Sequence, residues 1–139
     1  HLYENIVNVT VKEITKKFFH DKRFKGDVDI LRQCNFIGAT TNNPNTKADK
    51  LYSPHLPFIH FDTRWIKLAV SKGYIGSESN VYTVQETYLD EAMKIASQNQ
   101  IDCEPSGIAG LAVMLQMKNK LPKNKKMFIV NTGKTKYST

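Results

Sequence analysis

Two short polar runs in the second half of the sequence have the residue types of a ligand site. Glu104–Gly107 (Glu-Pro-Ser-Gly) precedes one apolar segment, and Asn131–Gly133 (Asn-Thr-Gly) follows another. Free amides at the start of a helix attract anions, and glycine lets a ligand approach the backbone closely. A hydroxyl and a glycine at the end of a buried strand suit a flat ligand, because open α/β sheets bind ligands there. An ordinary helix cap and an ordinary turn have the same residues, and spacing alone favours that plainer interpretation.

Other kinds of site find little support in the sequence. It contains no Walker loop, GxGxxG, GxSxG or HExxH motif, and its four histidines lack the spacing of a metal set. Two cysteines without CxxC spacing are too few for a zinc site or a disulfide scaffold. We expect Cys34 in the core. Cys103 is expected to be a buried, inert thiol, with a reactive thiol at a helix start as the alternative.

The spacing of apolar residues and the positions of turn residues predict the helices and strands that would position the two runs. Helices are expected over Glu4–His20 (a strand over Val7–Val11 is the competing interpretation), Asp27–Gln33, Arg64–Ser71, after Thr83–Glu86, and from Pro105 to about Lys118. Short strands are expected over Cys34–Ala39, Val81–Thr83 and Lys126–Asn131, with a turn over Thr40–Thr46 and irregular chain over 48–61. Helices that alternate with short, non-alternating apolar strands predict an α/β fold with a largely parallel sheet.

Two of these helices have specific start signals. Thr83-Val84-Gln85-Glu86 has the pattern of a capping box, in which Thr83 and Glu86 bond to each other's backbone amides. The helix that follows is expected to bury Leu89, Ala92, Met93 and Ala96. Pro105 can open the next helix, where a missing amide costs nothing. That helix is apolar nearly all round, so we expect it to be covered on several sides.

Length and composition bound the class of protein. The 139 residues amount to one domain, with 40% apolar and 24% charged residues. No apolar stretch approaches the roughly 20 residues of a membrane span. The net charge of +7 could attract nucleic acid, but arginine occurs only three times and the lysines are scattered. We therefore expect neither a nucleic acid nor a membrane as partner. Unpaired cysteines fit a reducing compartment, so a cytoplasmic location is expected.

Several stretches of the second half, taken together, are recognisable. Their order and spacing over about residues 80–137 resemble the carboxyl-terminal part of the fold-type-II pyridoxal-phosphate enzymes, the tryptophan-synthase-β-like superfamily. The stretches are Thr83–Glu86, Asp90–Met93, Cys103–Ala112 and Val130–Lys134, and Phe36–Thr40 looks like the strand before that family's variable loop. The family includes threonine synthase, threonine and serine dehydratases and cysteine synthase.

The resemblance implies a three-layer parallel sheet with flanking helices that binds pyridoxal 5'-phosphate at strand ends. The family sets a Ser or Thr hydroxyl against the pyridine nitrogen, and in the threonine synthase and dehydratase branches that residue corresponds to Thr132. Gly133 would allow the ring to approach, and Glu104 and Ser106 would line the pocket beneath it. The cysteine synthase branch has its serine where this sequence has Pro105, so the sequence sides with the other branch.

The resemblance also implies a larger enzyme. The family's Schiff-base lysine and its glycine-rich phosphate loop lie in an amino-terminal part, and no lysine here has the surrounding motif, so no catalytic residue is assigned in this chain. Residues 1–139 are thus expected to be the carboxyl-terminal portion of a lyase or synthase that performs β-elimination or β/γ-replacement on a small amino acid. Its expected partners are the missing amino-terminal part and a second subunit of a homodimer. The fragment alone would be inactive. The alternative is a non-catalytic α/β module that binds a partner through its basic face.

Overall fold

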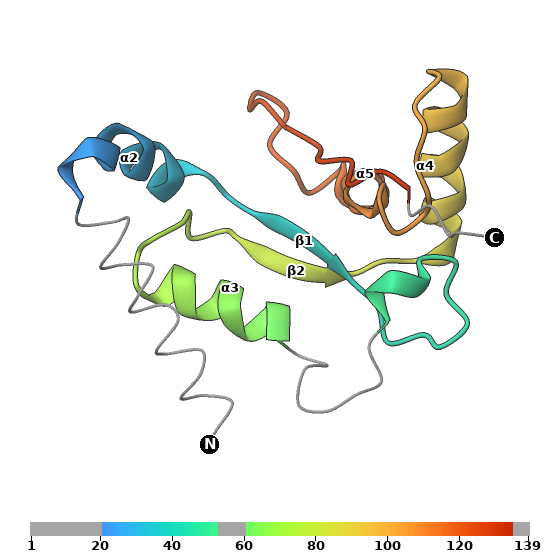
Figure 1. Ribbon diagram of the computed structural model, residues 1–139, viewed down its shortest axis with the longest axis horizontal. Coiled ribbons are helices and arrows are strands. Elements are labelled where there is room, and N and C mark those ends of the chain that lie inside the picture. Colours follow the sequence, from blue (N-terminus) through green and yellow to red (C-terminus); the bar gives the residue numbers. More distant parts are fainter. Residues whose placement is uncertain (1–20, 53–60, 135–139) are drawn as a thin grey trace. The chain divides into compact units, whose positions relative to one another are not determined.

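The computed structural model describes residues 21–52 and 61–134 (Figure 1). The chain divides into two compact units, one of His1–Phe36 and His55–Val81 and the other of Ile37–Pro54 and Tyr82–Thr139. The predicted helix over Glu4–His20 lies outside the described residues.

The described residues of the first unit form two α-helices. The helix α2, Lys25–Gln33, follows the 3₁₀ turn η2, Lys22–Phe24, and confirms the helix expected over Asp27–Gln33. The helix α3, Phe61–Ser71, begins three residues before the expected start at Arg64. It ends as the sequence indicates, because Gly73 adopts a left-handed φ of 70° and its amide bonds to the carbonyl of Val70.

The strands β1, Ile37–Thr40, and β2, Asn80–Thr83, form a two-stranded parallel sheet. Just outside the paired strands, the amide of Asn80 bonds to the carbonyl of Phe36. The amide of Val84 bonds in the same way to the carbonyl of Thr40, so the offset between the two strands stays constant. The short strands predicted near Cys34–Ala39 and Val81–Thr83 are thereby confirmed, with β1 starting later than expected.

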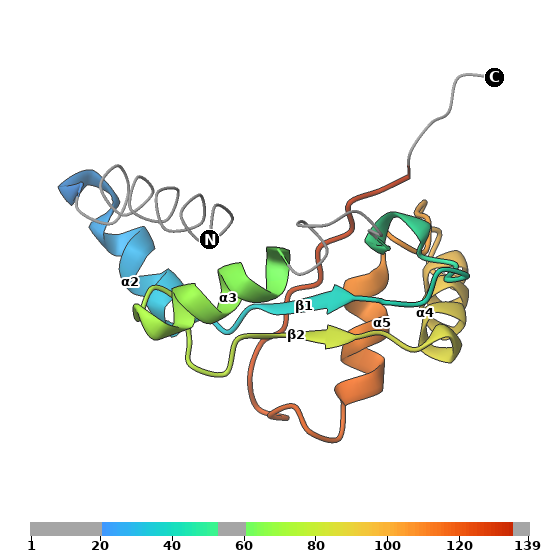
Figure 2. The same ribbon diagram turned by 90° about the horizontal axis from the view of Figure 1, so that it is seen from below.

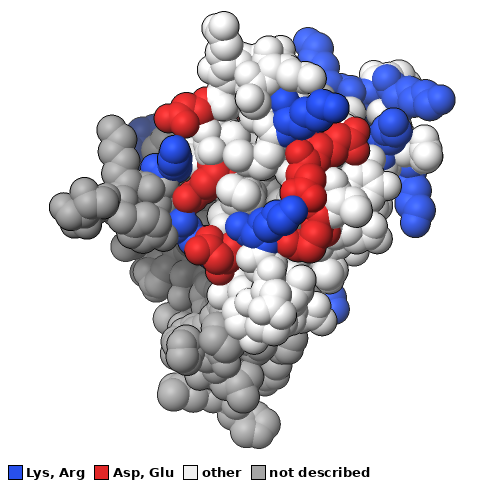
Figure 3. Space-filling model, turned by 90° about the vertical axis from the view of Figure 1, so that its right-hand side faces the viewer, with Lys and Arg blue, Asp and Glu red and all other residues white. Residues whose placement is uncertain are grey.

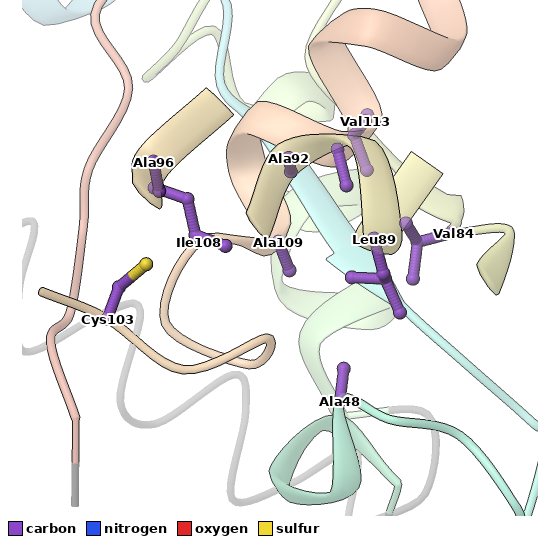
Figure 4. Packing of buried hydrophobic residues seen from close by; sticks show 10 residues of the cluster. Ala48, Val84, Leu89, Ala92, Ala96, Cys103, Ile108, Ala109 and Val113 are labelled. Atoms are coloured by element: carbon purple, nitrogen blue, oxygen red, sulfur yellow. The ribbon is translucent and has the colours of Figure 1, made fainter. Parts of the chain in front are cut away.

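The second unit is built around two helices, α4, Glu86–Gln98, and α5, Ala109–Met117. Helix α5 packs against both α4 and β1 (Figures 1 and 2). The buried side chains between these elements are Ala48, Val84, Leu89, Ala92, Ala96, Cys103, Ile108, Ala109, Ala112 and Val113, and Figure 4 shows them closely grouped. Of the four residues expected to be buried on α4, three are buried and Met93 is partly so.

Helix α5 starts later than the sequence indicates. Pro105 was expected to open it, but Pro105–Ile108 form turns and regular α-helix begins at Ala109. The physical reason is that the Gly107 carbonyl accepts from the Thr132 amide of a distant segment. The Leu111 amide, which would bond to Gly107 in a regular helix, bonds to the Ile108 carbonyl instead. The expected helix is confirmed from Ala109 to its end.

The strand predicted over Lys126–Asn131 is wrong. Met127–Val130 belongs to no sheet in the described part of the chain, and it is exposed, with Phe128 at 89% and Val130 at 73% of full exposure. A strand needs neighbours for its backbone groups. Among the described residues, the backbone of Met127–Val130 makes no backbone hydrogen bond. Ile129 approaches α5, with its Cγ2 3.8 Å from the position that a Cβ would take at Gly110.

Candidate functional site

The two polar runs singled out from the sequence lie side by side in the second unit. The amide of Glu104 donates to the carbonyl of Gly133 at 3.1 Å, and the amide of Thr132 donates to the carbonyl of Gly107 at 3.0 Å. A Cβ atom at Gly107 would collide with the Gly133 carbonyl oxygen, so only glycine allows this approach. The structure therefore brings Glu104, Ser106, Thr132 and Gly133 together on two paired segments.

Asn131 shapes the second of these segments. Its Oδ1 accepts a hydrogen bond from the Gly133 amide at 2.8 Å, and its Nδ2 donates to the Asp102 carbonyl at 3.3 Å. The turn leaves Gly133 at a φ of 88°, a left-handed conformation that favours glycine. Asn131 was not assigned a role from the sequence, although an asparagine two residues before a glycine is a common turn signal.

The exposed side of this turn presents an open backbone position and a threonine hydroxyl. Among the described residues, no atom beyond its two chain neighbours lies within 4 Å of the position of a Cβ at Gly133, so the backbone is open on that side. Thr132 is exposed, and its hydroxyl has no hydrogen-bond partner among the described residues. A hydroxyl donor beside open backbone is chemically compatible with the nitrogen and the face of a pyridine ring.

Lys50 also belongs to the site, although sequence reasoning missed it. It lies in the 3₁₀ turn η3, Asp49–Leu51. Its Nζ contacts Glu104 Oε2 at 2.8 Å, and its backbone amide donates to Ser106 Oγ at 3.1 Å. Ser106 thus accepts from Lys50 and keeps its own proton for another acceptor. Lys50 is 54 residues from Glu104 in the sequence, and no motif surrounds it.

The loop that carries Lys50, residues 41–52, is attached to the start of α4 through Glu86. The carboxylate of Glu86 accepts from Thr46 Oγ1 at 2.8 Å and from the Lys47 amide at 2.7 Å. The capping box is therefore wrong: Glu86 is the first residue of α4, and its N-cap Gln85 makes no side-chain cap bond. The Glu86 carboxylate, which the local pattern predicts to bond to the start of the helix, is hydrogen-bonded to Thr46 and Lys47 instead.

The two cysteines differ in their surroundings. Cys103 is 8% exposed, and its Sγ lies 3.9 Å from Met93 Sδ. Burial, and to a smaller extent the charge of Asp102, raises the pKa of the Cys103 thiol. Cys103 is accordingly a buried thiol, as expected. Cys34 is exposed, so the expectation that it lies in the core is wrong. It comes before β1 and not within it.

Acidic and basic side chains are interleaved on the face shown in Figure 3. The second unit contains the ion pairs Lys47–Asp90 and Lys50–Glu104. The described residues contain no group of three or more potential metal ligands. None of the described helices is long and apolar enough to cross a membrane.

The chain matches no family model, no curated protein and no solved structure. The resemblance to the fold-type-II enzymes therefore rests on the sequence stretches named above.

Proposed function

We propose that this chain is the carboxyl-terminal part of a pyridoxal-phosphate-dependent lyase or synthase that acts on a small amino acid. The reaction class is β-elimination or β/γ-replacement, as in threonine synthase, the dehydratases or cysteine synthase. One observation carries the proposal. Two segments that the resemblance assigns to one ring pocket, 104–107 and 131–133, are joined by two backbone hydrogen bonds.

The described residues would hold the cofactor in distinct ways. Thr132 would donate its hydroxyl to the ring nitrogen, and the open side of Gly133 would receive the ring face. Ser106 would offer its remaining proton, and Glu104, tied to Lys50, would border the pocket. When bound, pyridoxal phosphate supplies an electron sink for carbanion chemistry. Because a threonine hydroxyl is neutral, it does not hold the ring nitrogen protonated as a carboxylate would, and this favours elimination and replacement over transamination.

The finer architecture is part of the same proposal. In the whole enzyme, a three-layer parallel sheet with flanking helices would extend the two-stranded sheet seen here. An amino-terminal part would contribute the lysine and the phosphate loop, and the enzyme would be a cytoplasmic homodimer. The exposed apolar run Met127–Val130 supports this, because such a run needs cover.

A second candidate, a non-catalytic interaction module, has one observation in its favour. The lysines between α5 and Met127, namely Lys118, Lys120, Lys123, Lys125 and Lys126, are all exposed and adjoin the exposed apolar run. Such a surface could bind an acidic partner without any chemistry at Thr132.

Cofactor binding by the protein produced from its whole reading frame separates the two functions. The enzyme proposal expects one pyridoxal phosphate per chain by absorbance, together with turnover of a small hydroxy amino acid. The reading frame before His1 should also encode a lysine-bearing motif and a glycine-rich loop. A protein that binds no pyridoxal phosphate, or whose frame starts at residue 1, would contradict the proposal and leave the interaction module.

A further inference from the structure

Lys50 is held at the candidate site by the fold of its loop. Ala48, two residues before it, is fully buried in the core of the second unit. Thr46 and the Lys47 amide are bonded to Glu86 at the start of α4. These contacts hold the loop against the second unit. The Lys50 backbone amide bonds to Ser106 Oγ, and the Lys50 ammonium pairs with Glu104. Lys50 thus reaches the site through a backbone and a side-chain contact, unlike a surface lysine that pairs by its side chain alone.

The Lys50 ammonium balances negative charge beside the ring-binding turn. The Glu104 side chain is only 19% exposed and the Lys50 side chain 34%, so water screens this pair less than a surface pair. A second carboxylate lies near the ammonium. Asp49 Oδ1 is 3.8 Å from Lys50 Nζ. Loss of the ammonium would make the net charge beside the turn more negative, with Lys134, which directly follows Gly133, still present.

A more negative net charge beside the turn would change how a pyridine ring behaves at this site. A nearby anion favours the protonated, positively charged form of a ring nitrogen. When Lys50 is paired with Glu104, their opposite charges largely cancel, and the pair does not favour the protonated ring nitrogen. The neutral Thr132 hydroxyl is then the group that determines whether the nitrogen is protonated. The ion pair and the hydroxyl therefore act in the same direction.

We infer that Lys50 is a positioning residue of the cofactor site, which orients and neutralises Glu104 so that the ring nitrogen of pyridoxal phosphate stays unprotonated beside Thr132. The inference rests on the proposed function and deepens it, because it names a residue that controls the electronic state of the bound ring.

The experiment follows the protonation of a bound pyridine ring. Pyridoxine 5'-phosphate, which carries an alcohol in place of the aldehyde and forms no covalent bond with lysine, is bound to the whole protein. Its ultraviolet absorbance is then titrated with pH. Lys50→Met should move the midpoint to higher pH, and Lys50→Arg, which keeps the charge, should leave it at the wild-type position. Adding Glu104→Gln to Lys50→Met should bring the midpoint back.

Lys47→Met is the matched control. Lys47 lies in the same loop and pairs with Asp90, so this variant changes the net charge equally but away from Glu104. Its midpoint should equal that of the wild type. If Lys50→Met does not fold, Glu104→Gln alone tests the ion pair by removing its negative partner. This variant should move the midpoint to lower pH, because the remaining Lys50 ammonium disfavours the protonated ring nitrogen.

The failures of the two claims differ. A wild-type protein that does not bind pyridoxine 5'-phosphate overturns both the proposed function and the role of Lys50. The role of Lys50 alone is overturned if the protein binds pyridoxine 5'-phosphate but Lys50→Met leaves the midpoint of the pH titration unchanged. It is also overturned if Lys47→Met moves the midpoint as far as Lys50→Met does.

Discussion

The Thr132 hydroxyl is the single group on which the proposed chemistry depends most. In the whole enzyme, Thr132→Ser keeps the hydroxyl and should retain cofactor affinity and most turnover. Thr132→Val keeps the shape but removes the donor, which should cost about 1–3 kcal/mol. That loss corresponds to roughly 5- to 150-fold in affinity or rate. Cofactor titration and steady-state kinetics measure both. If the Val and Ser variants behave alike, Thr132 is only a turn residue.

Gly107 is the residue that lets the two site segments meet. Gly107→Ala would place a Cβ against the Gly133 carbonyl and should lower the free energy of unfolding by about 1–3 kcal/mol. Gly26→Ala is a suitable control, because Gly26 lies in α2 and no atom of the described residues lies within 4 Å of its Cβ position. The control should be neutral or slightly stabilising. Urea unfolding compares the two, and equal stability of both variants would argue against the close contact.

The two thiols should differ in reactivity. Burial raises the pKa of Cys103, which leaves less thiolate at neutral pH, whereas Cys34 is exposed. With a disulfide reagent, Cys103 should react about 100-fold or more slowly than Cys34, because it must wait for local opening. Cys34→Ser should remove the fast phase, and denaturant should make the two rates similar. A fast phase that survives Cys34→Ser would show Cys103 to be a reactive thiol.

At the scale of elements, local patterns predict helices better than they predict partners. The apolar stripe of α4 predicts which residues it buries, because a helix closes its own hydrogen bonds. The run Met127–Val130 is typical of a buried strand, yet a strand depends on neighbours elsewhere in the chain, and here it has none among the described residues. For the same reason the capping box at Glu86 fails, since Thr46 and Lys47 bind the carboxylate.

In the candidate site, too, local sequence patterns predict some residues, whereas partners from elsewhere in the chain are not predicted. The residues Glu104, Ser106, Thr132 and Gly133 could be selected from the sequence because each lies in a short motif with a family resemblance. Lys50 could not, because it lies in an irregular loop and meets Glu104 only through the fold. The expected reason for the placement of Thr132, the end of a buried strand, is wrong; hydrogen bonds to Glu104 and Gly107 hold that segment instead.

At the scale of the molecule, the exposed run Met127–Val130 should cause self-association of the isolated 139 residues. Phe128→Ser together with Val130→Ser should weaken association at least about tenfold, a change of about 1.4 kcal/mol. Ile30→Ser is the control, because Ile30 is also exposed but stands outside the run. Sedimentation at several concentrations measures the effect. A sharp monomer peak for the unaltered chain at high concentration, with a cooperative melt, would contradict the expectation.

The most direct test of the proposed site is a crystal structure of the protein from its whole reading frame, grown with pyridoxal phosphate. We predict that the ring lies against Gly133, with its nitrogen within about 3 Å of the Thr132 hydroxyl, a normal hydrogen-bond distance. Glu104 and Ser106 should border the ring, with Lys50 still paired to Glu104. A cofactor bound elsewhere, with 104–107 and 131–133 paired as here but facing only water, would contradict the assignment.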